Sequence, residues 1–292
     1  MDPPGGARAR RRMNPAPPRA EKKSNFFLGF ILLPKAKREA LSAAYAYCRL
    51  IDDIVDNTET PKDEARKELE FWRREIEALY SGRATHPIAK ALEAPVSSYK
   101  IPKEAFLEMI RGCSMDLEQS RYETISDLES YMRGVASSVG VMCVHIFGWK
   151  HTPPERMREF ATTFGYAFQL TNIIRDVGAD LELGRVYLPQ ADLRAAGYTV
   201  EKLAHREHDF AFDHLMAGEY NRAKEYYARA RGLVDPRDRP ALLPAEIMAH
   251  VYEGLLDEIK EQKFRVLYQK TRLPGHRKLV LALKAWAYCH GF

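Results

Sequence analysis

Length, composition and charge restrict what this chain can be. It has 292 residues, of which 46% are hydrophobic and 29% charged, with a formal net charge of +5, which is sufficient for one or two globular domains with a sizeable core. Its four cysteines show neither paired metal-ligand spacing nor a disulfide framework. No stretch approaches the ~20 apolar residues of a membrane span or contains a secretory signal. We therefore expect a cytoplasmic protein.

Residues 1–23 differ in composition from the rest of the chain. They read MDPPGGARARRRMNPAPPRAEKK and contain almost nothing that could be buried, so they predict a disordered tail. A basic arm can bind nucleic acid or an anionic membrane. We favour the simpler alternative, an extension upstream of a chain that begins functionally near Met13.

Residues 24–292 show recurring helix signals and no recurring strand alternation. Pro61 and Pro153 have the character of first-turn prolines. Thr152 and Glu155 have the spacing of a capping box for the second of these helices. No tandem repeat or internal linker interrupts the segment, which predicts one all-α domain.

The stretch YAYCRLIDDIVDN places three aspartates in an apolar run. Helical spacings of four, three and four residues put four polar side chains on one stripe. These are Tyr45, Arg49, Asp52 and Asp56, with Asp53 at the edge of the stripe. Burying unpaired carboxylates is costly, so positive charge must compensate them. Taken alone, the stripe favours a solvated face or a cluster neutralised by Arg49.

A second stretch, YAFQLTNIIRDVGADLELGRVYLP, changes this interpretation. Spacings of three, four and four residues again form a single helical stripe. Its members are Gln169, Asn172, Asp176 and Asp180, with Arg175 beside them. Two polar stripes flanked by Leu, Ile, Val and Phe suggest facing walls of one cavity. Their oxygen ligands suit Mg²⁺, which completes its shell with water and substrate phosphates, so we expect several Mg²⁺ ions that enter with a diphosphate.

Both stretches resemble the paired aspartate motifs of the squalene/phytoene synthase family. The intervening MDLEQSRYETISDLESYMRGVASSVGVMCVHIFG is similar to the central family segment, and the resemblance extends from about Lys23 to the C-terminus. Such a long ordered match is much stronger than a short motif. It implies the all-helical isoprenoid synthase fold around a central apolar cavity, and head-to-head (1'–1) prenyl transfer.

The chain departs from the family pattern at two positions. Ala179 stands where the family usually has an acidic residue, but the following Asp180 is retained. Asn25 replaces a small hydroxyl residue in KKSNFFLGF. Contact between this loop and a diphosphate would then come from Lys23 and Ser24, together with Lys22.

The resemblance also implies roles for individual residues. The expected metal site comprises Asp52, Asp53, Asp56, Asn172, Asp176 and Asp180, with Asp53 assisting from outside the inner ligand set. The expected diphosphate-binding residues are Lys23, Ser24, Arg49, Gln169, Asn172, Arg175 and Arg185. The expected catalytic residues are Tyr45, Arg49, Tyr131, Arg175, Tyr187 and Tyr252. Tyrosine rings can stabilise a cation and a hydroxyl can relay a proton, although core packing remains an alternative for each tyrosine.

The detailed wording of the motifs resembles bacterial presqualene diphosphate synthases of hopanoid and squalene biosynthesis. We therefore expect two farnesyl diphosphates to form presqualene diphosphate, without NADPH. The absence of a GxGxxG fingerprint argues weakly in the same direction. The alternatives are a phytoene or dehydrosqualene synthase, a squalene synthase that completes an NADPH reduction, and a catalytically dead assembly or scaffold homologue. Pocket depth would select a farnesyl or a longer prenyl diphosphate; downstream isoprenoid enzymes are candidate partners, and nucleic acid is not.

The C-terminal segment mixes basic and apolar residues. The two sets are Arg265, Lys270, Arg272, Arg277, Lys278 and Lys284, and Leu267, Leu273, Leu279, Val280, Leu281, Leu283 and Trp286. This pattern is typical of a helix on anionic lipid, which would place the protein peripherally on the inner membrane face. A terminal helix that packs on its own domain would show the same pattern.

Overall fold

The computed structural model describes residues 33–57 and 59–292. The predicted tail over 1–23, and with it Lys23, as well as Ser24 and Asn25, lie outside these residues. In the described part, helices account for the regular structure, and extended backbone pairs only in an isolated bridge between Arg121 and Val186. The predicted all-α fold is confirmed.

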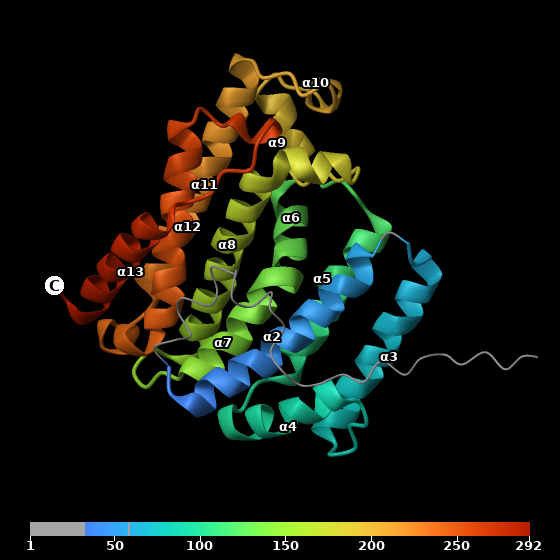
Figure 1. Cartoon of the computed structure of the whole chain (residues 1–292), viewed down its shortest axis with the longest axis vertical. Helices are drawn as coiled ribbons and strands as arrows, with labels where there is room; N and C mark the ends of the chain where they lie inside the picture. Colours follow the sequence, from blue (N-terminus) through green and yellow to red (C-terminus); the bar gives the residue numbers. More distant parts are fainter. Residues whose placement is uncertain (1–32, 58) are drawn as a thin grey trace, which may run out of the picture.

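The helices follow one another around a single core (Figure 1). The first half contains α2 (Lys35–Asp56), α3 (Lys62–Tyr80), α4 (Pro87–Tyr99), α5 (Lys103–Glu118), α6 (Ile125–Met132), the π-helix η2 (Arg133–Ser137) and α7 (Ser138–Phe147). The second half contains α8 (Pro154–Glu182), α9 (Gln190–Ala195), α10 (Val200–Ala204), α11 (Phe210–Leu233), the 3₁₀ turn η3 (Pro236–Leu242), α12 (Leu243–Glu261), the 3₁₀ turn η4 (Arg265–Leu267) and α13 (Gly275–His290).

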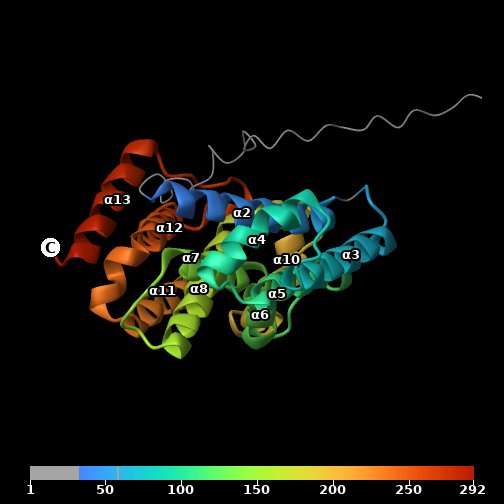
Figure 2. The same cartoon turned by 90° about the horizontal axis from the view of Figure 1, so that it is seen from below.

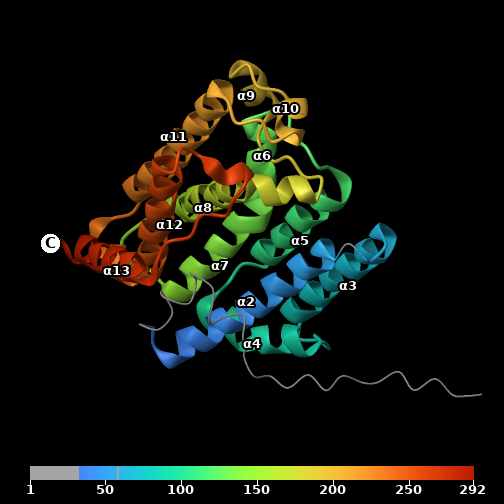
Figure 3. The ribbon, with the colours of Figure 1, turned by 45° about the horizontal axis from the view of Figure 1, so that its top comes forward.

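The centre of the molecule is α8, a helix of 29 residues. Its buried positions include the unbroken run 163–167, so the middle of the helix is buried on every side. A helix that is apolar all round is expected in a core. The helices α11, α12, α7 and η2 pack against it, while α2, α3 and α5 form the neighbouring part of the bundle (Figures 1 and 3).

Glycines allow the π-helix η2 to approach its neighbours closely. A Cβ added to Gly112 of α5 would lie 2.5 Å from Cα of Gly134 in η2. On the other side of η2, a Cβ added to Gly165 of α8 would lie 2.5 Å from Cα of Ser137. Real Cβ atoms do not approach backbone this closely, so these contacts require glycine. The turn of π-helix is thereby held between α5 and α8.

The loop between α7 and α8 is anchored by a buried carboxylate. Asp238 of η3 accepts hydrogen bonds from the backbone amides of Lys150, His151 and Thr152 at 2.6–3.2 Å. The Thr152 hydroxyl also donates to Asp238, at 2.8 Å. The predicted capping box of Thr152 with Glu155 is therefore wrong, because Thr152 is bound to a long-range partner and α8 begins at Pro154 after an uncapped Pro153.

We predict that Gly112→Ala lowers the free energy of unfolding by about 1–3 kcal/mol, because the new methyl group meets backbone that must shift. Gly218→Ala is a matched control within α11, where an added Cβ meets no atom within 4 Å. It should raise stability by up to about 1 kcal/mol through helix propensity. Urea unfolding followed by circular dichroism measures both. Equal midpoints for the two variants would show that the contact between α5 and η2 is not tight.

Candidate active site

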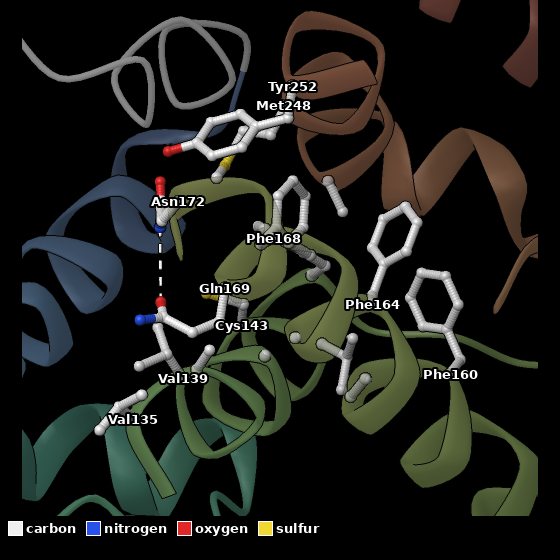
Figure 4. A pocket seen from close by; sticks show the side chains of 17 residues that line it. Val135, Val139, Cys143, Phe160, Phe164, Phe168, Gln169, Asn172, Met248 and Tyr252 are labelled. Carbon is white, nitrogen blue, oxygen red and sulfur yellow. Dashed lines mark hydrogen bonds between the residues drawn. The ribbon is translucent and has the colours of Figure 1, made fainter. Parts of the chain in front are cut away.

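An apolar cavity of about 220 Å³ lies between η2, α7, α8 and α12 (Figure 4). Its wall includes Val139 and Cys143 from α7 and Met248 from α12. The expected central apolar cavity is confirmed. Such a cavity accepts a hydrocarbon ligand and excludes water from it.

One row of side chains along α8 connects this cavity to the acidic residues. Phe160, Phe164 and Phe168 line the cavity in steps of four residues, and Asn172 follows at its polar end. Continuing by fours leads to Asp176 and Asp180. Residues four apart are neighbours on a helix surface, so α8 itself leads from the apolar wall of the cavity to these two carboxylates. The region of the two aspartate stripes, beyond the polar end of the cavity, is here called the mouth.

The polar end of the cavity contains an unpartnered oxygen. The side-chain amide of Asn172 donates to Oε1 of Gln169 over 3.4 Å (Figure 4). Oδ1 of Asn172 is buried, and it has no hydrogen-bond partner among the described residues. Buried polar atoms are almost always paired, so this oxygen marks a position for a donor or a cation. Tyr252 stands at the same end.

The aspartates of α8 are in different electrostatic states. Burial opposes ionisation of Asp176, but hydrogen bonds from Arg175, at 2.9 and 2.5 Å, and from Lys270, at 2.8 Å, hold its pKa below the usual range. Burial, and then the charge of Asp176, raise the pKa of Asp180 to about 7. The charges of Arg185 and Lys270 oppose this rise in the pKa of Asp180 only in part. A cation at this position would stabilise the ionised form of Asp180.

The aspartates of α2 face the same region. Burial, and then the charge of Asp56, raise the pKa of Asp52 to about 6. Arg49 contacts Asp52 at 3.2 Å and the exposed Asp53 at 2.5 Å. Arg185, three residues beyond α8, contacts Asp56 at 3.0 Å. This ion pair links two residues that are 129 apart in sequence, and it brings the α2 stripe to the segment that follows the α8 stripe.

Asp116 of α5 lies between the two stripes and was not among the site residues predicted from the sequence. It accepts hydrogen bonds from the hydroxyls of Tyr131, at 3.0 Å, and Tyr187, at 2.8 Å, whose rings stack with centroids 5.1 Å apart. Burial raises the pKa of Asp116, and Asp56 adds to the effect. The available sequence signal was its place in the segment MDLEQSRYETISDLESYMRGVASSVGVMCVHIFG, which resembles the central family segment.

The predicted tyrosines occupy separate parts of this region. Tyr131 and Tyr187 share Asp116, while Tyr252 lines the cavity and interacts with Arg175. Tyr45 is half-buried on α2, one turn before Arg49. These positions are compatible with the predicted catalytic roles of the four tyrosines, which stay predictions.

The acidic residues fit divalent cations only if another ligand completes the coordination. Within 33–57 and 59–292, no three His, Cys, Asp or Glu side chains are grouped closely enough to hold an ion. Mg²⁺ typically takes one or two carboxylates and fills its shell with water and phosphate oxygens. The orphaned oxygen of Asn172 and the two carboxylate stripes suit this mode. The region can thus receive a molecule with an apolar chain and a polyphosphate head.

Comparisons with known proteins agree with this geometry. The sequence model of the squalene/phytoene synthase family matches residues 19–277. A 15-cis-phytoene synthase from Synechocystis sp. is 33% identical over 280 residues, which cover 91% of this chain and 82% of the relative. A presqualene diphosphate synthase from Zymomonas mobilis is 34% identical over 263 residues, covering 89% and 87% of the two chains.

A similar solved structure is that of a dehydrosqualene synthase in complex with a ligand. It has a TM-score of 0.81 and 27% identity, and the match covers 93% of this chain and 94% of that one. The sequence match and the shared fold extend over both aspartate stripes, the cavity and the central segment with Tyr131. The chain therefore belongs to the squalene/phytoene synthase family of head-to-head prenyltransferases.

Proposed function

We propose that the protein condenses two farnesyl diphosphates head to head, giving presqualene diphosphate and inorganic diphosphate. The observation that carries this proposal is the row along α8, which leads from the apolar cavity at Phe160 to the carboxylates at Asp176 and Asp180. A prenyl diphosphate has the same polarity along its length. Its hydrocarbon chain would occupy the cavity and its head group the mouth.

The first half of the reaction breaks the bond between C1 and the diphosphate oxygen of one substrate. Arg49, Arg175 and Arg185 lie at the mouth and would bind the oxygens of the departing diphosphate with their forked donors. Mg²⁺, which we propose is held by the two aspartate stripes, supplies further positive charge to this leaving group. The apolar cavity keeps water away from the allylic cation.

The second half forms the new carbon–carbon bonds. The electron pair of the acceptor's double bond attacks the cation, and loss of one proton closes a cyclopropane ring while the acceptor keeps its own diphosphate. We assign relay of that proton to the hydroxyls of Tyr131 and Tyr187, which would pass it to the carboxylate of Asp116, because both hydroxyls donate hydrogen bonds to that carboxylate. The ring faces of these tyrosines can also stabilise positive charge. The reaction as proposed ends here and requires no NADPH.

Phytoene synthesis from two longer, C20 diphosphates is a second candidate function. Sequence identity supports it about as well as the first candidate. The chain is 33% identical to the phytoene synthase of Synechocystis sp. and 34% identical to the presqualene diphosphate synthase of Zymomonas mobilis. Both functions would use the same mouth. They differ in the length of chain that the cavity must accept and in the fate of the cyclopropyl intermediate.

We predict that the purified protein with Mg²⁺ and farnesyl diphosphate releases presqualene diphosphate, with the same product in the presence of NADPH. Asp176→Asn should reduce turnover about a hundredfold or more, because it removes the negative charge of a proposed Mg²⁺ ligand and so weakens the hold on the ion that stabilises the leaving group. Asp63→Asn is the control, since Asp63 lies on α3 and pairs only locally with Arg66, at 2.8 Å.

Mass spectrometry identifies the product, and circular dichroism checks that each variant is folded. Phytoene from the C20 substrate, without product from the C15 substrate, would establish the second candidate instead. Normal turnover by Asp176→Asn at limiting Mg²⁺ would refute the ligand assignment. An absence of turnover with every prenyl diphosphate would support the non-catalytic alternative.

We also predict that Mg²⁺ and inorganic diphosphate raise the melting temperature only when both are present, because the described carboxylates do not form an ion site by themselves. At a concentration 100 times Kd the stabilisation is about 2.7 kcal/mol, which corresponds to roughly 5 °C or more. Differential scanning calorimetry measures it. Asp52→Asn should abolish the joint shift and Asp63→Asn should retain it. A full shift with Mg²⁺ alone would contradict the proposed dependence on diphosphate.

A further inference from the structure

The outward face of α13 is apolar and exposed. Leu279, Val280, Leu283 and Trp286 are 64%, 52%, 60% and 46% exposed, respectively. Their spacing of one, three and three residues places them on one stripe. On the opposite side, Ala285 is buried, and α13 packs against α12. The helix α13 that carries the stripe lies at the outer edge of the molecule (Figures 1 and 2).

The apolar stripe belongs to a segment that is exclusively basic in its charged residues. Residues 265–292 contain no Asp or Glu, but they contain Arg265, Lys270, Arg272, Arg277, Lys278 and Lys284. Of these, Arg265, Arg272 and Lys284 are exposed, and among the described residues they form no ion pair with an acidic side chain. An anionic surface would complement them.

The structure divides the predicted basic and apolar mixture into inner and outer parts. Lys270 contacts Asp176 at the candidate active site, and Arg277 pairs with Glu258 of α12. Leu267 and Leu273 are buried. These four residues therefore contact the protein itself, as expected for a terminal segment that packs on its own domain. The apolar stripe of α13, in contrast, is not covered by any described residue.

The α13 face is connected to the mouth of the cavity. The segment between η4 and α13 carries Lys270 to Asp176. The helix α12 separates the cavity from α13: its Met248 and Tyr252 line the cavity, and its Gly254 lies against Leu281 of α13. A surface that holds α13 would thus lie one helix away from the cavity. Within the described chain no helix has the length and apolarity to cross a membrane.

We propose that the outward face of α13 docks on an anionic lipid bilayer. The stripe of Leu279, Val280, Leu283 and Trp286 would enter the boundary between headgroups and acyl chains. Arg272 and Lys284 would contact anionic headgroups. A second copy of the chain is a poorer occupant, because two such faces would bring basic residues together without acidic partners. The proposal is independent of the reaction that the cavity catalyses.

Flotation of the full-length protein with lipid vesicles tests this proposal. The vesicles contain phosphatidylcholine alone or with about 30% phosphatidylglycerol, at low and high salt. The wild-type protein should bind the anionic vesicles and lose affinity as salt rises. The double variant Leu279→Ser/Leu283→Ser should bind at least about tenfold more weakly, equivalent to about 1.4 kcal/mol. Phe210→Ser, at a side chain 86% exposed on α11, is the matched control and should bind normally.

The basic residues need a separate pair of variants. Arg272→Gln/Lys284→Gln should weaken binding to anionic vesicles and reduce its dependence on salt. Arg74→Gln/Lys90→Gln removes the same charge from exposed positions on α3 and α4 and should have little effect. All variants keep residues 1–23, so a difference between them cannot come from the basic tail. Circular dichroism and urea unfolding verify that each variant is folded.

Fluorescence quenching reports directly on the depth of α13. Acyl chains brominated near the headgroup should quench Trp286. Trp286→Phe should remove most of that quenching because, of the chain's two other tryptophans, Trp72 is buried in the core and Trp149 is half-buried in the loop after α7. Equal vesicle binding by the wild-type protein and the Leu279→Ser/Leu283→Ser variant would overturn the proposal. So would a dimer, seen by analytical ultracentrifugation, that dissociates in this variant while neither protein binds vesicles, since the face would then hold a second copy.

Discussion

The placement of carboxylates at the edge of an apolar cavity is the constraint on which the rest of the structure depends. Desolvation and mutual repulsion raise the pKa of Asp52 and Asp180, so the folded chain needs positive charge at this position. Part of it comes from Arg49, Arg175, Arg185 and Lys270, and the stripes remain able to receive more. Under the proposed function, Mg²⁺ ions that enter with a diphosphate would supply the rest.

Helical packing fixes the position of these carboxylates relative to the apolar cavity. The cavity and the mouth share α8, so their relative position follows from one rigid helix rather than from a flexible loop. The glycine contact between α5 and η2 keeps Asp116 and Tyr131, which flank that contact in sequence, close to the same mouth. Fold and chemistry are therefore coupled through a few close backbone contacts.

The sequence predicted the parts of this arrangement that depend on local periodicity. Both aspartate stripes and the helices that carry them follow from spacings of three and four residues, and the match over 19–277 identifies the family and fold. The sequence did not predict the roles of Asp116 and Lys270, because the residues that they contact are distant in sequence. Thr152 shows the same limit, because the carboxylate of Asp238, 86 residues away, displaced a local capping box that had the right spacing.

The central claim is that the apolar cavity and the two aspartate stripes bind one prenyl diphosphate through metal ions. A crystal structure with Mn²⁺ and a non-ionisable thiolo analogue of farnesyl diphosphate tests it most directly. The account predicts anomalous Mn²⁺ peaks beside Asp52 or Asp56 and beside Asp176 or Asp180, with diphosphate oxygens between them and the chain directed towards Phe160. Metal ions bound away from both stripes, or a chain outside the cavity, would contradict it.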